Sequence, residues 1–158
     1  MDSAFISSWN ARVGYDDNIF HVGDFCYRSA KAASSYLERL NGRKHLIWGN
    51  HDPQEVRELP GWASSAPMRE ISVDGQGIVL CHYGMRVWNG SHHAGDRATL
   101  HFYGHSHGRL PGNDHSVDVG VDYPAWNYAP VRLDEIRRHL RTLPPYQSPE
   151  VAERGSTS

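Results

Sequence analysis

Residues 44–52 are Lys44-His45-Leu46-Ile47-Trp48-Gly49-Asn50-His51-Asp52. The largely apolar first half is typical of a buried β-strand, and the glycine that follows lets the backbone turn sharply. An amide, an imidazole and a carboxylate are therefore delivered together at the end of one strand. An Asn oxygen is a neutral hard ligand, so Asn50 is a candidate metal ligand. The neighbouring His51 is directed elsewhere and is a candidate proton donor, with Asp52 holding its ring in one tautomer.

The same arrangement of strand, glycine and polar group recurs along the chain. Gly23-Asp24 follows the apolar run 18–22, His82 follows the run 78–81, and Gly104-His105-Ser106-His107-Gly108 follows the run 98–103. A carboxylate such as Asp24 can bridge two cations. The combined set of one carboxylate, one amide and several imidazoles at one sheet edge predicts a site for one or two divalent metal ions that cuts phosphate esters.

Each motif has a plainer interpretation when it is taken alone. Gly-Asp is a common turn, 50–53 is compatible with an ordinary Asx turn before a proline, and His82 is compatible with a satisfied core histidine. The distribution of the 11 histidines favours a metal site, because they cluster around glycine turns without forming a polyhistidine run. We therefore interpret the four motifs together as one metal site.

The periodicity of apolar residues predicts an α/β fold: a layered sandwich of mixed β-sheets flanked by helices. Residues 74–75, Asp-Gly, indicate a hairpin, and 56–62 is irregular. The order of elements predicts a β-α-β unit first and antiparallel hairpins later. The expected helices are 3–13, 30–40 and 131–140, and the expected strands are 18–22, 44–48, 68–73, 77–81, 98–103 and 116–121. We expect one domain over 1–141 and a flexible, Pro-, Ser- and Gly-rich tail over 142–158.

Composition narrows the class of protein. A formal net charge of −2 gives no strong nucleic-acid signature. The chain has no apolar run long enough to span a membrane, and its first residues do not form a signal peptide. Cys26 and Cys81 are compatible with a disulfide, but buried free thiols in a reducing compartment are favoured, which indicates a cytoplasmic protein.

The order Gly-Asp, Gly-Asn-His-Asp, His, Gly-His-x-His resembles the calcineurin-like metallophosphoesterases over residues 18–122. The resemblance implies a dinuclear centre at the edge of a β-sandwich. It implies that Asp24 bridges both metals, that Asn50, His82 and His105 complete one of them, and that His107 belongs to the other. In the same scheme His51 protonates the leaving oxygen.

One departure from the family pattern concerns its Asp-x-His motif on the first strand, which has no counterpart upstream of Asp24. We therefore expect the first strand to be absent and the second metal to keep only Asp24 and His107, too few ligands for tight binding. Either the enzyme runs on one metal, or a neighbour or another residue supplies the missing groups. An uncovered inner sheet position also favours a homo-oligomer.

The loop after His82 carries further polar residues, Arg86, His92 and His93. A loop next to a metal ligand is well placed to bind substrate, and Arg86 could hold a phosphate oxygen through its planar guanidinium. The alternative is a solvated loop with Trp88 packed in the core, and both interpretations remain open. His101, Asp118 and Asp122 are expected to be structural.

The leading functional hypothesis is hydrolysis of phosphodiesters, with promiscuity toward monoesters, by a metal-bound hydroxide. Histidine, Asn and carboxylate ligands suit Mn, Fe, Zn, Co or Ni better than Ca. The alternative hypothesis, supported by the absent Asp-x-His motif, is a catalytically weak or inactive metal-binding or scaffold protein derived from the same fold.

Overall fold

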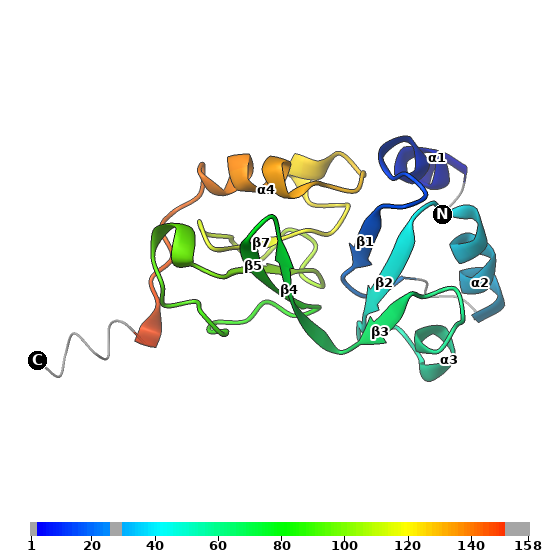
Figure 1. Cartoon of the computed structure of the whole chain (residues 1–158), viewed down its shortest axis with the longest axis horizontal. Coiled ribbons are helices and arrows are strands. Elements are labelled where there is room, and N and C mark those ends of the chain that lie inside the picture. The colour runs from blue at the N-terminus through cyan, green and yellow to red at the C-terminus, as the bar shows by residue number, and fades with distance from the viewer. Residues whose placement is uncertain (1–2, 26–29, 151–158) are drawn as a thin grey trace, which may run out of the picture.

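The structure, a computed structural model, describes residues 3–25 and 30–150 (Figure 1). None of the described helices is long and apolar enough to cross a membrane. The helices are α1 (Ser3–Arg12), α2 (Ala30–Arg39), α3 (Gln54–Arg57) and α4 (Leu133–Leu140), with short 3-10 helices at Gly95–Arg97 and Pro124–Trp126. The strands are β1 (Asn18–His21), β2 (Arg43–Ile47), β3 (Ser64–Ala66), β4 (Met68–Val73), β5 (Gln76–Cys81), β6 (Leu100–Tyr103) and β7 (Ser116–Asp118).

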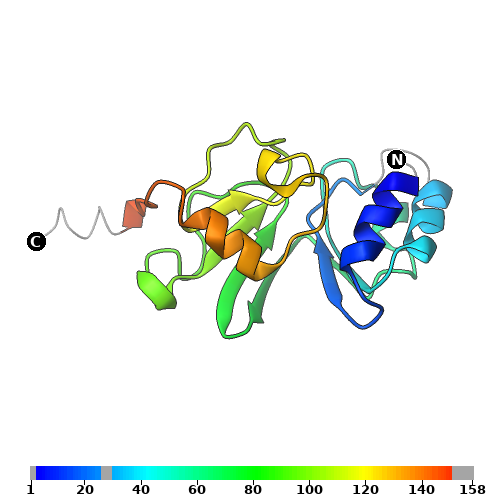
Figure 2. The same ribbon diagram turned by 90° about the horizontal axis from the view of Figure 1, so that it is seen from above.

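The first sheet has the order β1-β2-β3, and both of its pairings are parallel. The right-handed crossover that a parallel pair requires is supplied by the segment that contains α2. Helices α1 and α2 lie side by side against this sheet (Figure 2). A core shared by the sheet and its helices includes Trp9 of α1, Leu37 of α2 and Leu46 of β2, all at most 3% exposed.

The second sheet has the order β4-β5-β6-β7. Strands β4 and β5 form the antiparallel hairpin around Asp74-Gly75, whereas β5–β6 and β6–β7 are parallel. Helix α4 packs on this sheet through Ile136 and Leu140, which share a core with Leu100 and Val117 (Figure 1).

The two sheets face each other. Because side chains alternate along a strand, neighbouring residues of β2 pack in different cores. Leu46 packs in the first core, whereas the next residue, Ile47, packs in the core of the second sheet together with Phe20 and Val22. The α/β layered sandwich of mixed sheets and flanking helices is therefore confirmed.

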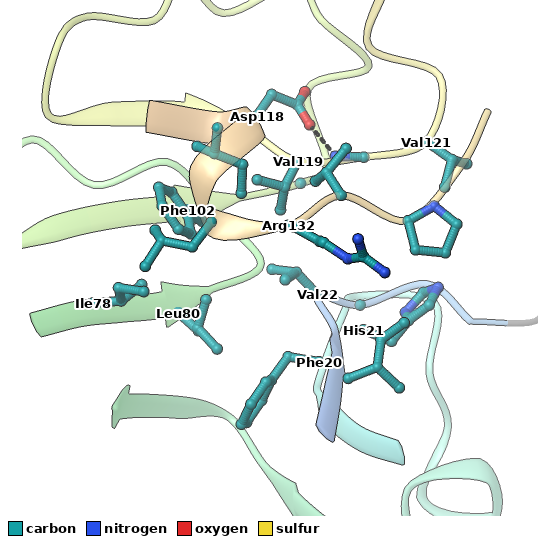
Figure 3. Close-up of a pocket in the computed structure, with 18 of the residues that line it drawn as sticks. Phe20, His21, Val22, Ile78, Leu80, Phe102, Asp118, Val119, Val121 and Arg132 are labelled. Atoms are coloured by element: carbon teal, nitrogen blue, oxygen red, sulfur yellow. Dashed lines mark hydrogen bonds between the residues drawn. The ribbon is translucent and has the colours of Figure 1, made fainter. Parts of the chain in front are cut away.

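A cavity of about 1360 Å³ lies between the two sheets. In Figure 3, Phe20 and Val22 face Ile78, Leu80 and Phe102 across this space. All four residues of β1 line the cavity, and within the described residues β1 has β2 as its only strand partner. The expectation that an inner sheet position is uncovered agrees with this arrangement.

The expected elements are found to within three residues at each end, with three differences. Helix α3 and strand β3 flank the expected irregular stretch 56–62, of which only 56–57 is helical. Strand β7 ends at Asp118 instead of 121, since Asp118 turns back to bond the backbone of Gly120. Strands β4 and β5 form the expected hairpin, but the expectation of further antiparallel hairpins is wrong: β5–β6 and β6–β7 pair in parallel, because the long segments between these strands return the chain to the same end of the sheet.

Residues 142–150, the described part of the expected tail, contact the domain. Leu143 packs on the second core, the Tyr146 hydroxyl donates to the Arg86 carbonyl at 2.6 Å, and Glu150 lies 3.4 Å from His92. Residues 151–158 and Cys26 lie outside the described residues, while Cys81 has a free thiol.

Candidate metal centre

The predicted site residues follow the carboxyl ends of β1, β2, β5 and β6. Asp24, His105 and His107 have positive φ angles of 58°, 63° and 50°. This left-handed conformation is costly for residues other than glycine and is retained mainly where the surrounding structure requires it. The turns are therefore arranged so that these three side chains leave the strand direction and point along the sheet edge.

Four of the predicted ligands converge at this edge. The Asn50 Oδ1 atom lies 3.0 Å from His82 Nε2 and 3.1 Å from His105 Nδ1, and Asp24 Oδ2 lies 3.2 Å from His82 Nε2. Ligand atoms of Asp24, His82 and His105 lie within 4.8 Å of one another. We call Asp24, Asn50, His82 and His105 the edge cluster.

A hydrogen bond to the backbone fixes which ring nitrogen of His82 faces the edge cluster. Its Nδ1 lies 2.8 Å from the Val22 carbonyl oxygen, which can only accept, so Nδ1 carries the proton. Nε2 is then the ring nitrogen that faces the oxygens of Asp24 and Asn50 and that could bind a metal. Imidazole nitrogens gathered with a carboxylate oxygen and an amide oxygen form a donor set that fits a divalent metal ion.

The spacing of the edge cluster also fits a transition metal. Ligand atoms that bind one ion at about 2.0–2.2 Å must lie roughly 2.8–3.6 Å apart in octahedral or tetrahedral geometry. The distances of 3.0, 3.1 and 3.2 Å fall inside this range. Imidazole, amide and carboxylate ligands suit Mn, Fe, Zn, Co or Ni.

The edge cluster is buried on one side and open on the other. The side chains of His82 and Asp24 are 2% and 10% exposed, whereas Asn50 and His105 are exposed. The buried side chains hold the ligands in place, and the open side leaves room for substrate, as a catalytic metal site requires.

Asp52 organises the backbone around the edge cluster. Its side chain is buried, and its carboxylate accepts hydrogen bonds from the backbone N–H groups of Asp24, Phe25 and Gly49 at 2.8, 2.9 and 2.8 Å. Asp52 thereby ties the turn after β1 to the turn after β2.

His51 is exposed beside Asn50, and its backbone N–H donates to Asp24 Oδ1 at 2.8 Å. The peptide between Asn50 and His51 is therefore held by the same carboxylate that faces His82. The catalytic roles of His51 and Asp52 stay predictions.

His107 lies apart from the edge cluster. Its Nδ1 pairs with Asp122 Oδ2, a carboxylate we expected to be structural, and both residues are exposed or nearly so. Over residues 3–25 and 30–150, the group of His, Cys, Asp and Glu side chains close enough to share an ion is Asp24, His82 and His105.

The loop that follows His82 runs away from the edge cluster. The Gly90 carbonyl accepts from Thr99 N–H, just before β6 begins, and His115 Nε2 lies 3.3 Å from the His93 carbonyl, just before β7 begins. His92 and His93 therefore lie toward the amino ends of these strands, opposite the metal ligands. This placement gives no support to the substrate role of His92 and His93, which stays a prediction, as does that of Arg86.

Two neighbours of the edge cluster were not identified from the sequence. His21, on β1, has a buried Nδ1 without a hydrogen-bond partner among the described residues, and burial lowers its pKa. Tyr83 packs its ring on those of His82 and His105. The signal available in the sequence was their position: His21 lies three residues before Asp24, and Tyr83 directly follows His82.

Several known proteins are similar to this chain in sequence. Residues 4–119 match the family model of the calcineurin-like phosphoesterase superfamily domain. The chain is 29% identical to the Gene 66 protein of Mycobacterium phage D29, over 85% of this chain and 80% of that protein. It is 28% identical to the uncharacterized protein MJ1445 of Methanocaldococcus jannaschii, over 86% of this chain and 73% of that protein.

A solved structure shares the fold. The crystal structure of AQ665, a protein of unknown function from Aquifex aeolicus, matches with a TM-score of 0.63 and 19% identity, over 86% of this chain and 83% of that one.

Proposed function

Because this chain belongs to the calcineurin-like phosphoesterase superfamily, we propose that it is a metal-dependent hydrolase of phosphodiesters that also accepts phosphomonoesters. The observation that carries the proposal is the convergence of Asp24, Asn50, His82 and His105 at one sheet edge. Ligand atoms of Asp24, His82 and His105 lie within 4.8 Å of one another, and two of the four residues face solvent.

The edge cluster would hold one divalent cation. When bound, such a cation acts as a Lewis acid that polarises a phosphate oxygen and lowers the pKa of water. The chain's own contribution is to fix the ligands. His82 is oriented by the bond from its Nδ1 to the Val22 carbonyl, and Asp24 by the bond it accepts from His51 N–H.

His51 is proposed as the general acid. It follows a ligand directly in the chain and is exposed on the open side of the site, so its ring can reach the leaving oxygen of a bound ester. Asp52 is proposed as a positioning residue, because the three amide bonds that its carboxylate accepts hold the turns of Asp24 and Asn50 together.

A second candidate function, a metal-binding protein with little or no catalysis, is favoured by the placement of His107. This residue pairs with Asp122 and is not part of the edge cluster. A family member that relies on two metals would be weak or inactive with one.

Hydrolysis of bis-(4-nitrophenyl) phosphate separates the two functions. We expect turnover with added Mn²⁺, loss of turnover with a chelator, and loss of both metal and turnover in His82→Ala. Tyr128→Ala is the matched control, since Tyr128 is 67% exposed and is not part of the edge cluster. Bound metal without turnover in the parent chain would instead identify the non-catalytic function.

A further inference from the structure

Tyr83 presents an exposed aromatic ring next to the edge cluster. Its ring centroid lies 5.1 Å from that of His82, in an edge-on arrangement, and 4.8 Å from that of His105. Tyr83 is nevertheless 48% exposed. One part of the ring thus supports two metal ligands, and the rest faces solvent at the open side of the site.

Leu110 extends this apolar surface. It is 42% exposed, and its side chain packs so closely on Gly84 that a Cβ at Gly84 would lie 2.6 Å from Leu110 Cδ2. The Tyr103 hydroxyl donates to the Leu110 carbonyl and fixes the loop from beneath. Tyr83 and Leu110 together form what we call the ring shelf.

An exposed aromatic beside a charged site is a typical contact for a flat ligand group. Side chains such as tyrosine stack on nucleobases and other planar rings, and they do so with little dependence on the identity of the base. A phosphate ester bound at the edge cluster would lie beside His82 and His105, the two rings that Tyr83 contacts, so a group attached to the phosphorus is within reach of Tyr83.

We propose that Tyr83 determines specificity by stacking on a planar aromatic group of the substrate, so that the preferred phosphate esters are nucleotides and other aromatic esters. This inference rests on the proposed function, because it requires the phosphate group to bind at the edge cluster. Tyr83 is not a metal ligand in this scheme and acts on the group attached to the phosphate.

Binding without turnover tests the stacking contact. AMP and ribose 5-phosphate carry the same phosphate and sugar, and only AMP carries a base. We expect the Mn²⁺-loaded chain to bind AMP roughly 5- to 150-fold more tightly by calorimetry, which corresponds to about 1–3 kcal/mol for one stacked base. Binding of both ligands should be lost when the metal is chelated.

Three variants separate stacking from simple shielding of the histidines. Tyr83→Leu keeps an apolar cover over His82 and His105 but cannot stack, so the preference for AMP should fall toward unity while ribose 5-phosphate binds as before. Tyr83→Phe should retain the preference. Tyr128→Leu, at a tyrosine outside the edge cluster, should change neither affinity.

The outcomes are distinct for the two proposals. A preference for AMP that survives in Tyr83→Leu, or equal binding of both ligands by the parent chain, overturns the role of Tyr83 even where bis-(4-nitrophenyl) phosphate is hydrolysed. Failure of both ligands to bind, together with no hydrolysis, overturns the proposed function and the stacking contact with it.

Discussion

Asp52 illustrates how one buried side chain can shape a site without touching the substrate. An unpaired buried carboxylate is costly, and three backbone N–H groups offset that cost here. Because Asp52 directly follows His51 in the chain, the sequence predicted that its carboxylate orients the His51 ring. The bonds to Asp24 and Gly49 depend on how two separate turns dock, which no local pattern in the sequence reports.

His51 gives the first residue-scale prediction. In His51→Ala we expect turnover of phosphodiesters to fall by roughly 10²–10⁴-fold, the usual contribution of a general acid. Metal content should be unchanged, since the edge cluster is intact. The loss should shrink for esters with very good leaving groups, which need little protonation. An equal loss for all leaving groups, accompanied by loss of metal, would contradict this role.

His101 gives a prediction about pH. It is fully buried, and its Nε2 accepts the Met85 N–H at 2.9 Å, so its proton resides on Nδ1, which donates to the Val79 carbonyl at 3.0 Å. Burial lowers the pKa of His101 below its usual value of 6.5. The unfolded chain, where the pKa is ordinary, therefore binds the proton more readily than the folded one.

The contribution of His101 to stability is thus independent of pH above about pH 7, and stability falls as the pH drops below 6.5, by up to about 1.4 kcal/mol per pH unit from this residue. Urea unfolding at pH 7.5, 6.5 and 5.5 measures the slope. We expect His101→Gln to be less stable at pH 7.5 but to lose less stability on acidification. Identical slopes in the two proteins would show that His101 does not govern the effect.

At the scale of elements, the glycines at strand ends position the site. The backbones of the β1 and β2 turns approach so closely that a Cβ at Gly49 would lie 2.3 Å from Asp24 Oδ1 and 2.4 Å from the Asp24 backbone nitrogen. The sequence predicted sharp turns after the apolar runs, and hence the shared edge. It did not predict β3, because Ser64-Ser65-Ala66 has no apolar alternation and is a strand only through its pairing with β2.

Gly49→Ala is the element-scale prediction. The added methyl group cannot be accommodated without moving the turn after β1, so Asp24 should leave the edge cluster. We expect loss of most bound metal, measured by elemental analysis after dialysis, and a lowered melting temperature.

Gly14→Ala is the matched control, since a Cβ there meets Asp17 at an ordinary 3.4 Å and Gly14 does not require a positive φ. It should retain metal and stability. Normal metal content in Gly49→Ala would mean that the two turns are not held together as the structure indicates.

At the scale of the whole molecule, the parallel pairing of β5, β6 and β7 was not foreseen. The pattern of short strands separated by turns is compatible with antiparallel hairpins. The strands pair in parallel because the loop 84–93 and the segment 105–115 carry the chain back along the sheet before the next strand begins. The layered sandwich could be predicted because the apolar periodicities of the elements leave few other ways to cover both faces.

The cavity between the sheets gives the last prediction. Protein interiors are normally close-packed, and backbone groups at an apolar sheet edge need partners. Here about 1360 Å³ is lined by Phe20, Ile78 and Phe102, and β1 pairs within the described residues with β2 alone. We therefore expect the chain to self-associate in solution, because association would cover the edge of β1.

Metal stoichiometry follows from the same arrangement. The edge cluster supplies four ligands, whereas a second ion would have only Asp24 and His107 among the predicted ligands, and His107 pairs with Asp122. We expect about one tightly held metal per chain, with a second bound weakly and only when metal is added. Elemental analysis and light scattering on the same freshly purified sample measure both quantities. A strict monomer with two tightly held metals would contradict both expectations, and the second ion would then require ligands such as His21, Asp118 or Asp122.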